Sequence, residues 1–234
     1  MACQYYHLCA GLKVGIDGAV HIVQAIWDGN STTEDWIFLL VDAKNAFKNI
    51  NGIGILWTVR HLWPSGARFV FTFYRHWSSL ILRNGNGTFS FMHSKEGVTQ
   101  GDPLAMIAYS IGILPLIKNL KREIPDVTQP WYTDDAGALG MFAIIDTSFN
   151  SLTRQGPGRI YYPEPSKSVL IIHLENLEAV KEFRERHVFK VCTGARYLGG
   201  YIRGNESNHN CMIYSTLTWE NNNRTIRKTA GEYP

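Results

Sequence analysis

Hydrophobic and polar residues alternate along this chain in blocks that predict both helices and strands. The clearest block is the unbroken apolar run at residues 36–41, which is typical of a strand buried on both faces. Further strands are predicted at residues 80–83 and 88–93, around the turn sequence Asn84-Gly85-Asn86-Gly87, and at residues 167–173 and 197–202. Helical periodicity covers residues 17–27, 52–62, 65–77, 103–122, 147–154 and 175–186. The order predicts an α+β fold, with an antiparallel sheet backed by helices.

The first predicted helix has a defined cap and a defined buried face. Asp17 can cap its N-terminus. The helix is expected to bury one face formed by Ala19, Ile22, Val23 and Ile26.

Two adjacent carboxylates lie at the tip of a further predicted hairpin, in the sequence Trp131-Tyr132-Thr133-Asp134-Asp135-Ala136-Gly137. Uncompensated carboxylates repel each other, so a fold that keeps them usually places a divalent cation between them. Most Asp-Asp pairs are solvated turns, and the dipeptide alone leaves that alternative open.

A third carboxylate, Asp42, directly follows the apolar run. A charge at the end of a buried strand is costly unless it meets a metal ion or a cation. The alternative is an aspartate that starts the next turn or caps a helix.

A glycine-flanked polar loop at residues 96–105 precedes the longest predicted helix, with Pro103 suited to its first turn. Such a loop can bring its backbone close to a ligand, and a helix start favours anions. Taken alone, the segment is better explained by an ordinary helix start.

In this order the segments resemble the motifs of the reverse-transcriptase family, of the type found in non-LTR retrotransposons and group II introns. Asp42 with Phe47 resembles the first palm motif, Thr99-Gln100-Gly101-Asp102-Pro103-Leu104-Ala105 the second, and Tyr132-Thr133-Asp134-Asp135 the third. Glu164-Pro165-Ser166-Lys167-Ser168 resembles the fourth motif, with Glu164 where many relatives have Asn, and Tyr197-Leu198-Gly199-Gly200-Tyr201-Ile202 the fifth. Together with Leu8-Cys9-Ala10-Gly11-Leu12-Lys13-Val14-Gly15, the resemblance covers about residues 5–203.

The resemblance implies an RNA-directed DNA polymerase with a palm fold. A primer 3′-hydroxyl would attack the α-phosphate of an incoming dNTP, and two Mg²⁺ ions (or Mn²⁺) about 3.5–4 Å apart can stabilise the attacking and leaving oxygens. By resemblance, Asp42 and Asp134 are the bridging metal ligands, and Asp135 is a more peripheral third carboxylate. The backbone carbonyl of Ala43 is an additional ligand.

Phe47 is implied to select the sugar of the incoming nucleotide. An aromatic ring below the sugar cannot satisfy a 2′-hydroxyl and therefore rejects it. The alternative is a core aromatic residue.

Further substrate contacts follow from the other motifs. Gln100 and Gly101 are expected to pack against the nucleotide and the template base. Lys167 is expected to protonate the departing pyrophosphate, or else to be a solvated surface lysine. Leu198 and Gly199 are expected to form a strand-turn that supports the primer terminus through its backbone.

Composition adds few constraints. The net charge of +3 neither favours nor excludes nucleic acid, and the positive residues are scattered rather than gathered in a tail. The four cysteines (Cys3, Cys9, Cys192 and Cys211) lack zinc-ligand spacing, and we expect reduced thiols in an intracellular protein. The longest apolar stretch, residues 104–117, is too short to span a bilayer.

The expected organisation is a palm with partial fingers at residues 1–203, followed by a polar tail at residues 204–234 with an incomplete or absent thumb. The expected partners are an RNA template, a DNA primer and a dNTP, with no membrane, and neighbouring segments of a larger polyprotein. Two alternatives remain. One is a non-catalytic palm that binds nucleic acid or a partner chain, and the other is an RNA polymerase, against which Phe47 argues.

Overall fold

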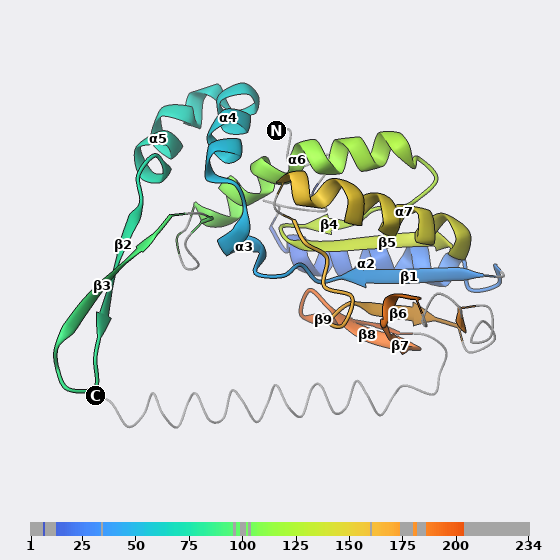
Figure 1. The fold of residues 1–234 in the computed structure, drawn as a ribbon. Coiled ribbons are helices and arrows are strands. Elements are labelled where there is room, and N and C mark those ends of the chain that lie inside the picture. The colour runs from blue at the N-terminus through green and yellow to red at the C-terminus, as the bar shows by residue number, and fades with distance from the viewer. Residues whose placement is uncertain are drawn as a thin grey trace.

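The apolar run at residues 36–41 forms β1 (Trp36–Val41), the middle strand of a five-stranded sheet (Figure 1). The strand order is β4-β5-β1-β6-β7, and β1 runs antiparallel to β5 (Asp135–Met141) and β6 (Val169–Ile172). Ile37 and Phe38, which point to opposite faces, are both fully buried, as predicted for this strand. The computed structural model of the chain describes residues 7, 13–33, 35–95, 97–98, 102, 104–159, 161–173, 180–181 and 186–203.

The two edge strands are short. β4 (Trp131–Tyr132) is antiparallel to β5, whereas β7 (Lys190–Cys192) runs parallel to β6. The sheet is therefore mixed, and the prediction of an antiparallel sheet is wrong at this edge. Parallel neighbours need a connection of a dozen or more residues, and residues 173–189 provide one. The helix predicted at residues 175–186 lies mostly outside the described residues.

Helices cover both faces of the sheet. α6 (Ala105–Glu123) and α7 (Phe142–Gln155) share a hydrophobic core with Ile37 and Leu39 on one face. α2 (Gly15–Gly29) packs on the opposite face, where Trp27 joins a second core that includes Phe38. The α+β prediction is confirmed, because alternate residues of one central strand supply both cores.

The first predicted helix is longer than expected and buries a different set of residues. Asp17 lies inside the first turn of α2 and Val14 takes the cap position, so the predicted capping role of Asp17 is wrong. Ala19 and Val23 are buried as predicted, but Ile22 is 42% exposed, and Trp27 is buried instead.

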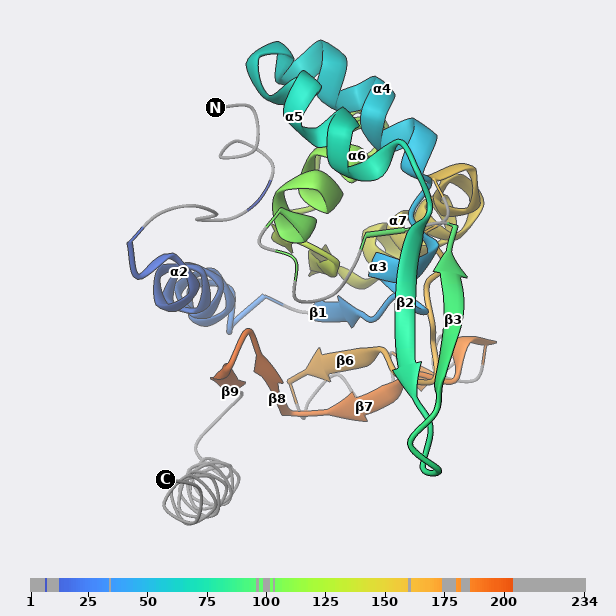
Figure 2. The same cartoon turned by 90° about the vertical axis from the view of Figure 1, so that its left-hand side faces the viewer.

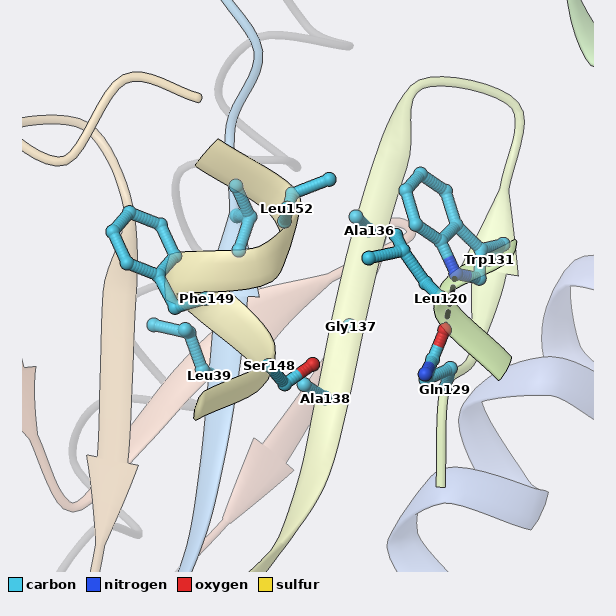
Figure 3. A pocket seen from close by; sticks show the side chains of 11 residues that line it. Leu39, Leu120, Gln129, Trp131, Ala136, Gly137, Ala138, Ser148, Phe149 and Leu152 are labelled. Atoms are coloured by element: carbon cyan, nitrogen blue, oxygen red, sulfur yellow. Dashed lines mark hydrogen bonds between the residues drawn. The ribbon is translucent and has the colours of Figure 1, made fainter. Parts of the chain in front are cut away.

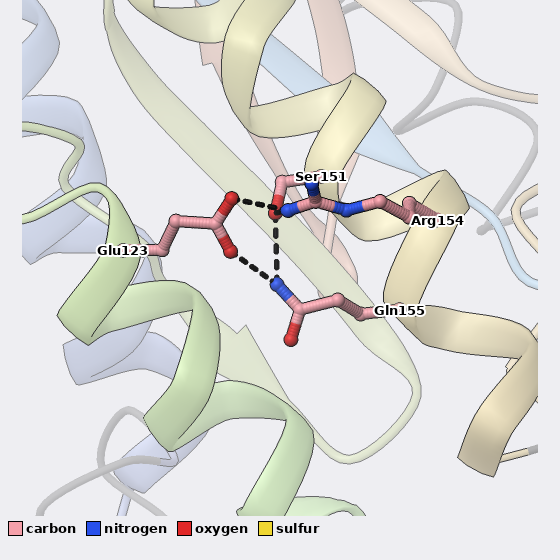
Figure 4. A network of polar contacts seen from close by, with 4 residues as sticks. All are labelled: Glu123, Ser151, Arg154 and Gln155. Atoms are coloured by element: carbon pink, nitrogen blue, oxygen red, sulfur yellow. Dashed lines mark hydrogen bonds and ion pairs between the residues drawn. The ribbon is translucent and has the colours of Figure 1, made fainter.

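Polar contacts join the C-terminal ends of α6 and α7 (Figure 4). Glu123 forms an ion pair with Arg154 and accepts a hydrogen bond from Gln155. The nearby Ser151 hydroxyl, and then Arg154, hold the pKa of Glu123 below its usual value. Because exposed ion pairs contribute little to stability, this network mainly sets how the two helices meet.

A second group of elements follows β1. It consists of α3 (Ala46–Asn49), α4 (Gly52–Leu62), α5 (Pro64–Tyr74), β2 (Ser78–Arg83) and β3 (Phe89–Ser94). β2 and β3 form a separate two-stranded sheet that extends away from the helices and the main sheet (Figures 1 and 2). The Gly87 amide donates to the Asn84 carbonyl at 2.9 Å, so the predicted hairpin turn is confirmed.

The C-terminal part of the described chain departs from the prediction of one strand at residues 197–202. It forms a hairpin of β8 (Gly194–Tyr197) and β9 (Gly200–Arg203), which follows the short helix η1 (Gly156–Arg159) and the sheet strands. Tyr197 and Ile202 join the core beneath α2. Within the described ranges, no helix is long and apolar enough to cross a membrane.

Candidate active site

The Asp-Asp sequence lies in the tight hairpin between β4 and β5. Tyr132 pairs with Asp135, so Thr133 and Asp134 form its two-residue turn. Thr133 has a φ of 57°, a conformation that two-residue hairpins favour but that β-branched residues rarely adopt. Since Thr133 is also buried, packing around it fixes the backbone that presents both carboxylates.

Small residues on β5 let the hairpin pack closely on its surroundings. The Gly137 amide donates to the Pro130 carbonyl at 2.8 Å, and a Cβ atom at position 137 would lie 2.7 Å from the Pro130 side chain. Trp131 is buried here and donates its indole N–H to Gln129 at 3.4 Å (Figure 3). The hairpin therefore has little freedom to shift relative to the sheet.

Asp42 occupies the position directly after β1. The last residue pair between β1 and β5 is Val41 with Ala136, so Asp42 lies one residue further along, at the end where Asp135 begins β5. The Asp42 carbonyl accepts from the Glu164 amide at 2.8 Å, and its own amide donates to the Ser168 hydroxyl at 3.2 Å. The segment that resembles the fourth motif thus holds the backbone of the first.

The three carboxylates interact electrostatically. Burial, and then the charges of Asp134 and Asp42, together raise the pKa of Asp135 to about 6. Burial also raises the pKa of Asp134; the hydrogen bond from its own backbone amide partly opposes this rise, and the charge of Asp42 adds a smaller increase. The structure therefore brings Asp42, Asp134 and Asp135 together at one end of the sheet, with their negative charges uncompensated.

The donor chemistry of this cluster fits an open magnesium site. Among the described residues, no three His, Cys, Asp or Glu side chains are arranged as a ready-made metal cage. Mg²⁺, however, is typically held by one or two carboxylates, with water and substrate phosphates completing its octahedron. The mutual repulsion of the three carboxylates is what such a cation would relieve.

Two buried tyrosines underlie the carboxylates, and no sequence motif indicated either of them. Tyr161 donates its hydroxyl to the Asp134 carbonyl at 3.2 Å. Burial raises the pKa of Tyr109 and Tyr161 well above the usual value, and the charges of Asp134 and Asp135 add to the effect. Both phenols are therefore neutral at physiological pH, and both lie close enough to the acidic cluster to feel its charge.

Phe47 lies on α3 and stacks on Tyr109, with ring centroids 4.8 Å apart. Its carbonyl accepts from the Val98 amide at 2.7 Å. Gly97 makes this contact possible, because its φ is +80° and a Cβ atom there would lie 2.4 Å from the Phe47 and Lys48 carbonyl oxygens. Gly97 and Val98 are thereby held against α3, and Phe47 is linked through Tyr109 to the carboxylates.

Asp102 organises the start of α6. Its carboxylate accepts from the Leu104 amide at 2.8 Å and from the hydroxyl of Tyr74 on α5. This is the helix-start role that the sequence left open for the segment. Gln100 and Gly101, the predicted nucleotide and template contacts, lie outside the described residues, so their roles stay predictions.

Two of the remaining predicted residues, Lys167 and Leu198, border a cleft at the end of the sheet. Asp42, Asp135, Lys167 and Leu198 line this cleft together with Arg196, which the sequence did not single out. Lys167 is exposed in the turn before β6. This geometry is compatible with either role proposed for Lys167, a proton donor or a surface lysine.

Three predicted residues, Leu198, Gly199 and Ala43, are placed by their backbone conformation or backbone contacts. Leu198 and Gly199 form the two-residue turn between β8 and β9, with φ of 48° and 83°. No atom lies within 4 Å of a Cβ built on Gly199, so glycine is needed here for the turn conformation and not for packing. Ala43 is buried and bridges to Pro163, which fixes the backbone next to Asp42.

Solved structures with a similar arrangement include telomerases. The telomerase from Candida albicans, in complex with a TWJ fragment of telomeric RNA, matches 74% of this chain with a TM-score of 0.57 and 10% identity. The apo telomerase from Candida tropicalis truncated from its C-terminal domain matches 73% with a TM-score of 0.55 and 12% identity. The fold is a reverse-transcriptase-like palm.

The palm spans 33% and 36% of those two telomerase chains, about a third of their length. No protein-family description matches the sequence, and neither does any curated protein. The likeness therefore concerns the fold alone. Within the palm, the strand end that carries Asp42 and the hairpin that carries Asp134 and Asp135 adjoin, which is the feature that bears on chemistry.

Proposed function

We propose that this chain is the palm of an RNA-directed DNA polymerase, which transfers dNTPs to a primer 3′-hydroxyl. The observation that carries the proposal is the meeting of Asp42, Asp134 and Asp135 at one end of the palm sheet, uncompensated and with raised pKa values for Asp134 and Asp135. Neutral residues at these three positions would make the fold more stable, because buried charges without a partner are costly. The acidic residues are therefore better explained by a function than by stability. The order of the motifs further supports an enzyme of the non-LTR retrotransposon or group II intron type.

In this proposal Asp42 and Asp134 hold two Mg²⁺ ions, with Asp135 and the Ala43 carbonyl nearby. The ions, when bound, supply Lewis-acid stabilisation of the attacking and leaving oxygens. The rigid Thr133 turn and the hydrogen bonds around Asp42 keep the carboxylates in place before substrate arrives. Lys167, in the same cleft, is the proposed donor of a proton to pyrophosphate.

The partners proposed are an RNA template, a DNA primer and a dNTP. The similarity to a telomerase solved with RNA supports an RNA template. Phe47 is proposed to exclude ribonucleotides, and its stacking on buried Tyr109 supports this role, because a fixed ring discriminates better than a mobile one. Gln100 and Gly101 are proposed to contact the nucleotide and the template base, and Leu198 and Gly199 the primer terminus.

The test is primer extension on poly(rA)/oligo(dT), with and without Mg²⁺. Asp134→Asn should reduce dTMP incorporation by at least about a thousandfold, since it removes a charge that the transition state requires. Asp126→Asn is the matched control, because Asp126 is an exposed aspartate at the opposite end of β5 from the acidic cluster. Undiminished incorporation by the Asp134 variant would show that the metal assignment is wrong.

The second candidate is a palm that binds nucleic acid or a partner chain without turnover. The absence of a preformed three-residue metal cage in the described part of the chain favours it. It predicts that the chain retains a labelled primer–template while incorporating no dNTP at any Mg²⁺ or Mn²⁺ concentration. Metal-dependent incorporation that Asp134→Asn abolishes would exclude it.

A further inference from the structure

The β2–β3 hairpin exposes large hydrophobic side chains far from the carboxylates. Ile81, Phe89 and Phe91 are 64%, 62% and 69% exposed. An isolated two-stranded hairpin is only marginally stable in water, and contiguous exposed apolar surface marks interaction sites. A bound partner would therefore cover a surface that the fold itself leaves open.

The strand register places the aromatic residues on one face. Ile81 pairs with Phe91 and Arg83 with Phe89, and because both pairs are two residues apart, their side chains share a face. Ser79 and His93, the next pair in the same phase, extend this face toward the base of the hairpin. We call these three residue pairs the aromatic face.

A hollow continues the aromatic face at the base of the hairpin. It is lined by Arg75, His76, Trp77, Ser79 and His93, the last two of which belong to the aromatic face. The ammonium of Lys95 lies 4.4 Å from the centre of the Trp77 ring. Aromatic rings and cations therefore alternate along one continuous surface.

The charge around this surface is of one sign. Residues 43–95 contain seven Lys and Arg residues and not one Asp or Glu. Since the whole chain carries only +3, the rest of the protein is net negative. Seven of the 23 Lys and Arg residues thus lie in a segment without a single internal counter-charge, and that segment carries the exposed aromatic rings.

Exposed aromatic rings beside positive charges favour one kind of binding partner for this surface. A second copy of the chain would bring Arg83 and its neighbours against identical cations, and an apolar protein partner would desolvate them without compensation. Single-stranded nucleic acid offers phosphates for the cations and unpaired bases for the rings, the pairing that sequence-tolerant single-strand binders use. Charge complementarity therefore favours a nucleic-acid strand.

We propose that the aromatic face and the hollow at its base bind single-stranded nucleic acid, with bases stacked on Trp77, Phe89 and Phe91 and phosphates beside Arg75, Arg83 and Lys95. This activity goes beyond the proposed polymerase function, because it needs neither metal nor triphosphate. It belongs to a surface separate from the carboxylate cleft.

The experiment measures the affinity of a fluorescently labelled oligo(dT) for the full chain in EDTA, by anisotropy over a series of salt concentrations. Phe91→Leu keeps apolar area but removes the ring, and should weaken binding about tenfold, as expected for one stacked base. Phe91→Tyr should bind like the parent. Arg83→Gln should make the slope of log affinity against log salt shallower by about 0.7.

Control variants separate this surface from the rest of the molecule. Val188→Ala removes an equally exposed apolar side chain elsewhere, and Arg122→Gln an exposed cation on α6, and both should leave oligo(dT) affinity unchanged. Because binding is measured in EDTA and without dNTP, loss of polymerase activity and loss of strand binding are distinguishable. Equal affinity of Phe91→Leu, Phe91→Tyr and the parent would overturn the proposal. So would light scattering that shows a dimer dissociated by Phe91→Leu while oligo(dT) affinity is unchanged.

Discussion

Replacing Asp135 by Asn should stabilise the metal-free protein at neutral pH. In the folded chain the pKa of Asp135 is raised to about 6 from an ordinary 3.8, first by burial and then by Asp134 and Asp42. At about 1.36 kcal/mol per pH unit, that difference corresponds to roughly 3 kcal/mol. Because the Asp135 side chain is exposed on one side, solvent screening lowers the expectation to about 1–2 kcal/mol.

The sign of this effect depends on pH. The folded state holds the Asp135 proton more tightly than the unfolded state, so raising the pH from about 4 to 6 ionises the unfolded chain first and lowers the free energy of unfolding. Above about pH 6 the loss is complete. The Asn variant lacks this titration, so its advantage should be absent near pH 4 and full near pH 8.

Urea unfolding in EDTA, followed at several pH values between 4 and 8, measures the difference directly. Asp126→Asn serves as control and should follow the parent at every pH. An Asp135 variant that is no more stable than the parent at pH 8, or whose advantage grows as the pH falls, would refute the view that uncompensated charge destabilises this site.

Three further outcomes follow from the same geometry. Mn²⁺ at ten times its dissociation constant should stabilise the parent by about 1.4 kcal/mol and Asp134→Asn by much less, as measured by thermal unfolding. Phe47→Ala should raise the use of rNTPs relative to dNTPs in primer extension, since it removes the ring stacked on Tyr109; unchanged sugar selection would count against its proposed role. Gly97→Ala should destabilise the fold by about 2 kcal/mol or more in urea, because its Cβ would meet two carbonyl oxygens at a positive φ, whereas Gly85→Ala, in open space, should be close to neutral.

The sequence correctly predicted those elements that are determined by the residues of a single short segment. The apolar run of β1 and the Asn-Gly-Asn-Gly turn between β2 and β3 each contain the information that shapes them. The parallel pairing of β7 could not be predicted from its own sequence. Three residues carry too little periodicity to predict a strand, and tertiary packing decides with which strand they pair. For the same reason the sequence predicts a single strand at residues 197–202, whereas the structure has a hairpin whose first strand, β8, begins at Gly194.

In the candidate site, too, some features were predictable from a single sequence segment, whereas others depend on tertiary packing. Motifs indicated which carboxylates to expect, and the strand register brings Asp42 to the end where Asp135 begins β5. Tyr109, Tyr161 and Arg196 were not expected, because nothing in their own neighbourhoods distinguishes a tyrosine below a carboxylate from one in an ordinary core. Their positions follow only from how α6 and the chain after α7 pack on the hairpin.

The three neighbouring carboxylates lower the stability of the fold, and this loss of stability bears on their function. Ion pairs among the described residues lie elsewhere, at Glu123 and Asp146, and none involves Asp42, Asp134 or Asp135. Yet the surrounding structure is built to hold these three charges near one another, with a strained Thr133 turn and hydrogen bonds around the Asp42 backbone. Local strain and charge repulsion that persist together indicate a site whose stability is completed by something that binds there. In the proposed function a divalent cation would supply positive charge here, so the destabilisation that the three carboxylates cause and their proposed affinity for a cation would have one physical origin.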